Sequence, residues 1–387
     1  MKIVIVIDSW TEGNGAVVST KRMVEELKKR GHKITIVTTG EYDGDFYTIP
    51  GFYLPFVRQS LESMGFLFGI GKRDILKKAF EGADLVQIQF PFLLARNAVK
   101  IAKGMGIPVI GACHIQPENI IAAMGKKDRP LIEKMLYCIF NFCLFKHVDA
   151  VHCPSKHAAN ILRDHGSKAD FKIISNGIPK TYHHVDKPRP DWFSDHFVIV
   201  NVGRHSNEKR QVLLIEAVQR SKYKDNIQLL LCGKGNNTEQ LRKMGAELPL
   251  TPLIEYVTEG DKLLYLNTSD IYIHPSIIEL EGLSCLEAVG CGLPCLIGNS
   301  PHSQSTQFAL DERFIFEMDD ADALAAKIDF WYERRVLLRE LKQDVLQMAE
   351  QYRFDKCMDD MEAFHREVLR TRPEFAIFPN TVVVRRF

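Results

Sequence analysis

The chain has 387 residues, more than one hydrophobic core usually serves, so its length predicts two domains. Hydrophobic residues make up 45% and charged residues 26%, as in an ordinary globular protein. The 50 basic and 49 acidic residues leave a net charge of +1, which provides no overall field for a nucleic acid. Any anionic partner must therefore be bound by local clusters of charge.

The first half of the chain alternates strands with helices. Continuous apolar runs predict strands at residues 2–7, 33–38, 84–88, 108–111, 150–152 and 172–174. Between them, Val17, Thr20, Met23, Val24 and Leu27 recur at helical spacing. Apolar strands separated by helices predict a parallel sheet covered on both faces, which is a doubly wound domain.

Cysteine usage and the apolar runs bear on the compartment. None of the nine cysteines forms a C-x-x-C pair, which argues against a zinc site, and residues such as Cys138 and Cys143 are expected to be buried free thiols in a reducing cytosol. The chain begins in a strand with no signal-peptide pattern, so we expect a cytoplasmic protein. Residues 131–145 are mostly apolar but fall short of the about 20 residues of a membrane span, and they predict a buried helix instead.

Residues 183–195 interrupt the alternation with Pro188, Pro190 and several charges, and they predict an interdomain linker. The pattern then restarts, with strands predicted at 196–202, 227–232, 253–257, 271–274 and 295–297. Helices are predicted at 210–221, 238–244 and 320–350. The predicted domains are residues 1–185 and 196–355, followed by a helix and tail at 356–387 that pack back toward the first domain.

Two parallel-sheet domains leave a cleft, and ligands of such sheets bind beyond the carboxyl ends of the strands. One such position, residues 274–294, reads HPSIIELEGLSCLEAVGCGLP and holds Glu279, Gly282 and Glu287 between a strand and a helix. A turn that opens a helix presents free N–H groups to an anion, and the carboxylates suit sugar hydroxyls. The arrangement therefore fits a ligand that is part diphosphate and part sugar; an ordinary strand–turn–helix crossover is the alternative.

Other strand ends carry weaker signals. Gly203, Arg204 and Lys209 follow one strand, where the two cations would stabilise a leaving diphosphate or else be solvated loop residues. A glycine-rich turn at residues 13–15 suits phosphate or sugar but lacks the spacing of a dinucleotide fingerprint, which disfavours a dehydrogenase. His114 follows another strand and either faces the ligand or is hydrogen-bonded in the core.

Together these features resemble the retaining glycosyltransferases of family 4, which have the GT-B fold. The resemblance is carried by the Glu-x7-Glu pair from Glu279 to Glu287, by Arg204 with Lys209, by Pro154-Ser155, and by the N-G-I run at 176–178. It implies an α/β architecture of two doubly wound Rossmann-like domains facing across a cleft. Acceptor binding would belong to the first domain and nucleotide-sugar binding to the second. Residues 14–20 and 303–310 further resemble the bacterial enzymes that glycosylate diacylglycerol.

The resemblance also implies roles for particular residues. Glu279 would bind hydroxyls of the donor sugar, Glu287 the ribose, and Arg204 with Lys209 the diphosphate. The expected catalytic residues are His114, Arg204, Lys209 and Glu279. The expected nucleotide-sugar site consists of Gly15, Gly203, Arg204, Lys209, Gly233, Val257, Glu279, Gly282, Leu283, Ser284 and Glu287.

Two positions depart from the family pattern. Glu281 stands where an apolar residue is common, and Arg210 follows the phosphate lysine where glycine is common. They leave open whether the sugar is glucose or galactose. The family generally works without a bound metal, so we expect no metal and no other cofactor.

A candidate membrane anchor lies at residues 66–78, FLFGIGKRDILKK. Apolar residues there precede the four cations Lys72, Arg73, Lys77 and Lys78, and each cation near an anionic surface contributes about 1 kcal/mol. A helix with a solvated lysine face is the alternative.

The resulting expectation is a peripheral enzyme at the inner face of the cell membrane. It would transfer glucose or galactose from a UDP-sugar to a lipid such as diacylglycerol or ceramide, with retention of configuration. Alternatives are a transferase of polysaccharide or lipopolysaccharide assembly, a nucleotide-sugar epimerase, and a non-catalytic nucleotide-sugar binding protein. No nucleic-acid partner is expected, and the oligomeric state stays open.

Overall fold

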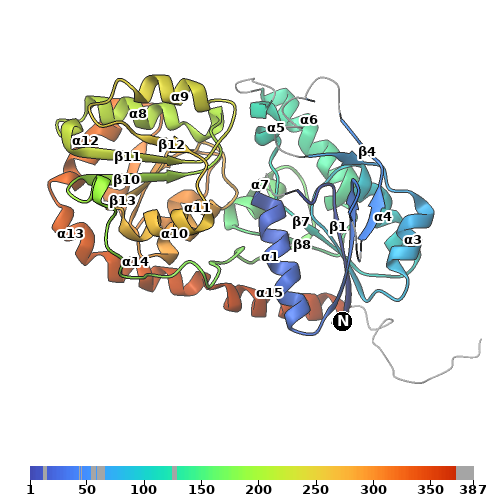
Figure 1. Ribbon diagram of the computed structural model, residues 1–387. Helices are drawn as coiled ribbons and strands as arrows, with labels where there is room; N and C mark the ends of the chain where they lie inside the picture. The colour runs from blue at the N-terminus through green and yellow to red at the C-terminus, as the bar shows by residue number, and fades with distance from the viewer. Residues whose placement is uncertain are drawn as a thin grey trace, which may run out of the picture.

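The computed structural model describes residues 1–11, 15–42, 44, 46–53, 58, 66–123 and 129–371. Two parallel-sheet domains lie side by side, with helices on the faces of each sheet (Figure 1). The strands of the first sheet come from residues 2–173 and those of the second from residues 197–317. The chain therefore has the predicted α/β architecture of two Rossmann-like domains.

In the first domain, seven parallel strands are found within the described ranges, in the order β3-β2-β1-β6-β7-β8-β9. They are β1 (Lys2–Ile7), β2 (Lys33–Thr39), β3 (Phe46–Ile49), β6 (Leu85–Ile88), β7 (Val109–Ala112), β8 (Ala150–Cys153) and β9 (Asp170–Ile173). The central strand β1 is almost fully buried because its apolar residues meet helices on both faces. A short antiparallel pair, β4 (Gly51–Phe52) and β5 (Phe68–Gly69), lies beside this sheet.

The helices of the first domain are α1 (Gly15–Lys29), α3 (Arg73–Phe80), α4 (Leu93–Gly104), α5 (Pro117–Ala123), α6 (Pro130–Phe140), the π-helix η2 (Asn141–Phe145) and α7 (Lys156–Asp164). Helix α1 buries the predicted stripe at Val17, Thr20, Met23, Val24 and Leu27. The apolar segment 131–145 is not the buried helix that its composition predicts. It forms α6 and η2, which bury one face and expose the other, because the helices lie at the domain surface.

In the second domain, six parallel strands occur among the residues described, in the order β12-β11-β10-β13-β14-β15. They are β10 (Phe197–Val202), β11 (Ile227–Cys232), β12 (Leu253–Glu255), β13 (Ile271–His274), β14 (Cys295–Asn299) and β15 (Ile315–Glu317). The helices are α8 (Gln211–Arg220), α9 (Thr238–Gly245), α10 (Glu259–Thr268), α11 (Leu283–Gly290), α12 (Ala321–Tyr332), α13 (Arg335–Glu340) and α14 (Lys342–Ala349). The predicted single helix over 320–350 is thus three shorter ones.

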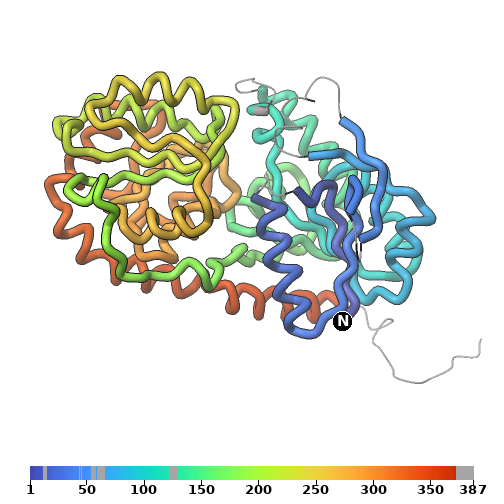
Figure 2. Tube along the Cα trace, viewed as in Figure 1, coloured from blue at the N-terminus to red at the C-terminus, as the bar shows by residue number. Residues whose placement is uncertain are grey.

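The chain crosses between the domains twice, and the two crossings touch. After the second domain it returns beneath the first domain as α15 (Phe354–Arg370), which Figure 2 shows in red. At the crossing, the N–H of Ile178 donates to the carbonyl of Tyr352 (2.7 Å), and the N–H of Phe354 donates to the carbonyl of Ile178 (3.1 Å). The two segments therefore form one hydrogen-bonded connection between the domains.

Helix α15 belongs to the core of the first domain. Its apolar side chains pack with those of β1 and α1 in one cluster, to which Met358, Met361 and Phe364 contribute. The buried ring of His365 hydrogen-bonds the side-chain carbonyl of Gln87 on β6 (2.9 Å). The predicted tail beyond residue 371 lies outside the described residues.

Candidate functional site

A cavity of about 1220 Å³ lies between the two domains and is lined by residues of both. Ten of the twelve predicted site residues form part of its wall: Gly15, His114, Gly203, Arg204, Lys209, Glu279, Gly282, Leu283, Ser284 and Glu287. These residues come from strand ends and helix starts far apart in the sequence. The structure therefore brings them to one place, as the parallel-sheet topology requires.

Gly233 and Val257 are the two predicted residues that do not reach the cavity wall. A side chain on Gly233 would collide with the carbonyl oxygen of Gly203, 1.9 Å from the position of its Cβ, so this glycine serves close backbone packing. Val257 packs against the apolar core of the second domain. The loop after Gly233 does reach the cavity, through Lys234 and Gly235.

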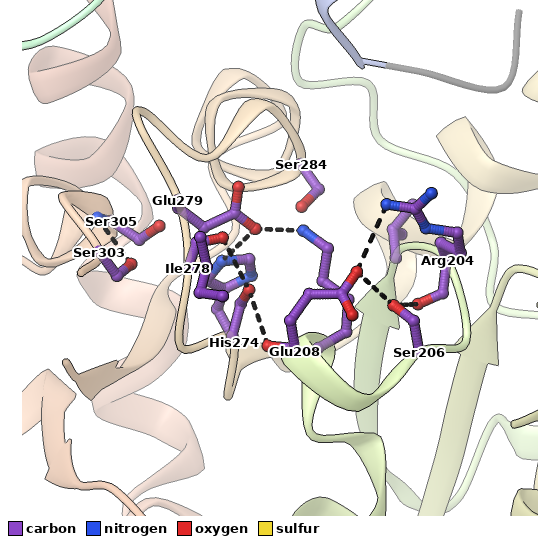
Figure 3. Close-up of polar contacts among 12 residues, drawn as sticks. Arg204, Ser206, Glu208, His274, Ile278, Glu279, Ser284, Ser303 and Ser305 are labelled. Carbon is purple, nitrogen blue, oxygen red and sulfur yellow. Dashed lines mark hydrogen bonds and ion pairs between the residues drawn. The ribbon is translucent and has the colours of Figure 1, made fainter. Parts of the chain in front are cut away.

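Glu279 is the centre of the polar cluster. It follows β13 on a loop held by two backbone hydrogen bonds, from its own N–H to the carbonyl of His302 and from the N–H of Gln304 to its carbonyl (both 3.0 Å). Its carboxylate forms an ion pair with Lys209 and lies 3.3 Å from Nε2 of His274. Figure 3 shows Glu279 and His274 facing each other beside the loop that carries Arg204.

The charges of Lys209, His274 and Glu279 stabilise one another. Burial opposes protonation of His274, but the adjacent Cys285 and Glu279 outweigh it and raise the pKa of His274 to about 9. Burial would likewise raise the pKa of Glu279, but Lys209 and His274 hold that pKa far below its usual range. Near neutral pH the carboxylate is therefore ionised between two cations.

The loop after β10, which carries Arg204 and Lys209, is hydrogen-bonded to the loop that carries Glu279. Arg204 Nη2 lies 3.3 Å from the Glu208 carboxylate, and the Glu208 carbonyl accepts a hydrogen bond from the N–H of Ile277 (2.9 Å). Lys209 ends the short 3-10 helix η4 (Asn207–Lys209). The next residue, Arg210, has a φ of 54°, the left-handed region that favours glycine, which explains why glycine is common at this position in the family that the sequence resembles.

The start of α11 faces the other side of the cavity. Gly282 precedes the helix with a φ of 95°, and a Cβ there would lie 2.5 Å from the hydroxyl of Ser305, so only glycine fits. The first N–H groups of α11, those of Leu283 and Ser284, are free of helical partners and favour an anion. Leu283 also meets the first domain, 3.2 Å from where Gly15 would carry a Cβ.

Glu287 contacts both domains, which sequence reasoning missed. Its Oε1 accepts from Arg22 of α1 (2.9 Å), and its Oε2 accepts from Lys262 of α10 (3.1 Å). Both cations also lie against the ring of Tyr182, at 5.8 and 5.0 Å from its centroid. No sequence signal pointed to Arg22, because it belongs to an otherwise ordinary amphipathic helix.

Two further side chains of the cavity wall, His114 and Glu281, have pKa values displaced from their ordinary ranges. Burial and the neighbouring His152 lower the pKa of His114 to about 3, so this imidazole is neutral. Glu281 is 3% exposed, and its Oε2 accepts from the backbone N–H (3.1 Å) and side-chain amide (2.6 Å) of Asn176 in the first domain. Burial outweighs these hydrogen bonds and raises the pKa of Glu281 to about 7.

The apolar residues of the predicted membrane anchor differ in exposure: Phe66 is buried, whereas Ile70 is 53% exposed. Lys72, Arg73, Lys77 and Lys78 are exposed on and beside α3, far from the second domain (Figure 1). The aromatic residues predicted to accompany these cations do not lie beside them at the surface, because Phe66 and Phe68 pack in a cluster of phenylalanine rings at the cavity wall.

The prediction that Cys138 is a buried thiol is wrong, because its side chain is exposed on α6.

Neither a metal cluster nor a membrane span is present in the described part of the chain. Among those residues, no group of three or more His, Cys, Asp or Glu side chains could hold a metal ion. In the same residues no helix is both long and apolar enough to cross a bilayer.

Two parallel-sheet domains that share a cavity with a cationic loop and a helix start define the class of GT-B glycosyltransferases. The chain belongs to that class: residues 13–182 match the model of Glycosyltransferase Family 4, and residues 185–349 match the model of Glycosyl transferases group 1.

Relatives and solved structures agree with this assignment. The alpha-monoglucosyldiacylglycerol synthase of Streptococcus pneumoniae is 25% identical over 330 residues, which cover 78% of this chain and 72% of that protein. The enzyme of the same name from Acholeplasma laidlawii is 24% identical over 307 residues, covering 73% and 76%. The solved structure of Anabaena HepE in complex with UDP has a TM-score of 0.73 at 15% identity and covers 95% of this chain and 100% of that one, which supports the fold.

Proposed function

We propose that this glycosyltransferase moves a hexose, glucose or galactose, from a UDP-sugar to the hydroxyl of a membrane lipid such as diacylglycerol or ceramide, with retention of configuration. One observation carries the proposal: a single cavity joins a polar end that suits a nucleotide sugar to an aromatic end that suits a lipid. The synthesis of a glucosyl diacylglycerol by the two relatives, as their names state, supports the same substrate classes.

The polar end has the charges that a donor sugar requires. Arg204, Lys209 and the start of α11 together would stabilise a diphosphate and the charge that it gains on leaving. Glu279, held ionised between Lys209 and His274, would accept hydrogen bonds from sugar hydroxyls. Glu287 would accept from the ribose while keeping its two cations, because a carboxylate offers about four lone-pair sites.

The other end of the cavity is lined by phenylalanine rings. Their centroids lie 4.9 to 6.1 Å apart in a continuous chain of contacts. The rings belong to Phe52, Phe66, Phe68, Phe90, Phe92 and Phe140. A soluble sugar acceptor gains little from such a wall, whereas each apolar group of a lipid is stabilised by leaving water.

The carboxylates of the cavity favour direct transfer over a covalent intermediate. Among the described residues that line the cavity, the carboxylate of every glutamate accepts a hydrogen bond. These glutamates are Glu208, Glu259, Glu279, Glu281 and Glu287. The acceptor oxygen would attack the anomeric carbon from the face that the diphosphate leaves. The bond from carbon to diphosphate oxygen breaks as the new one forms, and the acceptor proton passes to the departing phosphate.

The test offers purified protein a panel of UDP-hexoses with diacylglycerol or ceramide in mixed micelles. We expect one glycolipid by mass spectrometry, with the α-linkage by NMR, formed at a rate roughly 10²–10³ lower by a Lys209→Ala control. A β-linked product, or no glycolipid with any donor, would contradict the proposal. Sugar found only in a polymer fraction would support polysaccharide assembly instead.

A further inference from the structure

Helix α6 and the adjoining η2 expose an unusual amount of apolar side chain. Leu131 is 85% exposed, Phe142 58%, Met135 53% and Ile139 42%. Together with the exposed Cys138 they form a surface that we call the α6 face. Contiguous apolar surface of this kind on a globular domain commonly marks an interaction site.

The α6 face is one side of a continuous helical surface. Leu131, Met135, Cys138 and Phe142 follow one another at intervals of three or four residues, which places them in one line along the helix. The opposite side, with Tyr137 and Phe140, is buried in the first domain. The segment is therefore anchored in the fold and presents its second apolar side outward.

Charge around the α6 face is positive. Arg129, Lys134 and Lys146 are exposed beside it, and the guanidinium of Arg96 lies 4.3 Å from the ring centroid of Phe142. Between residues 129 and 146 the sequence has a single acid, Glu133, which is half-buried. Apolar residues flanked by cations are what an anionic lipid surface attracts.

The α6 face is continuous with the aromatic end of the cavity. Ile139 belongs both to the face and to the cavity wall, and Leu136 on the same helix also lines the cavity. Leu93 at the start of α4 is 51% exposed and lines the cavity as well. An apolar path therefore runs from the outer surface to the phenylalanine rings.

We propose that the α6 face is the membrane-docking surface of this protein: it inserts into an anionic bilayer, and the acceptor lipid enters the cavity over Ile139 and Leu93. The proposal rests on the proposed function in taking a lipid as the acceptor. It differs from an anchor on α3, whose cations have a single large exposed apolar neighbour in the described part of that segment, Ile70. Figure 1 shows α6 at the top of the first domain and α3 at its outer end, so the two surfaces would present different sides to a membrane.

The experiment measures flotation with vesicles of phosphatidylcholine, with and without phosphatidylglycerol, in the absence of donor. We expect Leu131→Gln with Met135→Gln to lose roughly tenfold or more in affinity for the anionic vesicles. Val336→Gln on α13, which removes a 65% exposed valine from the second domain, is the matched control and should bind as the parent does. Unchanged binding of the double variant would overturn the proposal.

A label on Cys138 provides a measurement that does not depend on a variant. The other eight of the nine cysteines are buried, so an environment-sensitive dye should react at Cys138. We expect its emission to shift to the blue on anionic vesicles, and no shift would contradict insertion. If the double variant separates a dimer into monomers while vesicle binding persists, the face is an interface between copies instead.

Transfer assays separate this inference from the proposed function. The double variant should glycosylate a short-chain lipid in detergent micelles as fast as the parent and lose activity only on vesicles. A parent that binds vesicles through the α6 face but transfers sugar to no lipid would refute the proposed function and leave the docking surface standing.

Discussion

Replacing Glu281 by glutamine should stabilise the protein above neutral pH. The side chain is nearly fully buried where the two domains meet, and Asn176 donates two hydrogen bonds to one of its oxygens. A glutamine carbonyl can accept both bonds in the same geometry. The substitution therefore removes a buried charge while it keeps the contacts that position the loop.

The magnitude follows from the pKa of Glu281, which burial raises from 4.5 to about 7. The folded protein then holds a proton that the unfolded chain has lost, so stability falls as pH rises from 4.5 to 7 and stays lower above that range. The difference between these two pKa values corresponds to roughly 3 kcal/mol. With an unfolding entropy of about 2.1 cal/mol/K per residue, this corresponds to a rise in Tm of about 4 °C.

The assay compares the Tm of parent and Glu281→Gln by calorimetry at pH 4.5 and at pH 8.5. We expect little difference at the lower pH and the full increase at the higher one. Glu340→Gln, on the exposed end of α13, is the matched control and should change neither value. Melting curves of parent and Glu281→Gln that keep the same separation at both pH values would refute the reasoning.

Three further predictions concern the polar end of the cavity. Lys209→Ala should lower kcat/KM by roughly 10²–10³, because the leaving diphosphate loses a cation. The kcat/KM of the parent should fall as pH rises through about 9, where His274 loses the proton that holds Glu279 in place, and His274→Gln should lack this decline. Arg22→Ala should raise the KM for the donor roughly fivefold with little change in kcat, because it releases Glu287 without touching the reacting atoms.

Each kinetic prediction has an outcome that would contradict it. Equal losses in Lys209→Ala and in a Lys243→Ala control on the exposed side of α9 would mean a general effect of charge. An alkaline decline that persists in His274→Gln would assign the titration to another group. A fall in kcat at constant KM in Arg22→Ala would place Arg22 in the chemical step.

The sequence was most informative where burial acts on both faces of an element. Strands such as β1, β11 and β13 were predicted with correct bounds, because a short continuous apolar run between turns is typical of a strand covered on both faces. The edge strands β3 and β15 were missed, since they are short and half-exposed. The opposite error occurred at α6, where an apolar composition predicted burial but tertiary position decided which face met solvent.

The candidate site was predictable where a motif carries its own geometry. Glu279, Gly282 and Glu287 lie on one loop and one helix, so local spacing was enough to bring them together. Arg22 could not be found this way, because its partner Glu287 is 265 residues away in the sequence and only the folded domains bring them together. Glu281 was noticed as a departure from the family pattern, but its contact with Asn176 also depends on how the domains meet.

The position of α15 makes the first domain a discontinuous folding unit. Its sheet is complete in sequence by residue 173, yet the helix that covers part of it comes from residues 354–370, after the whole second domain. During translation the apolar surface of β1 and α1 that α15 covers stays exposed, or is bound by other factors, until the second domain has left the ribosome. Anyone who exchanges the first domain between relatives must likewise graft two separated segments, because a fragment that stops at the linker would lack part of its own core.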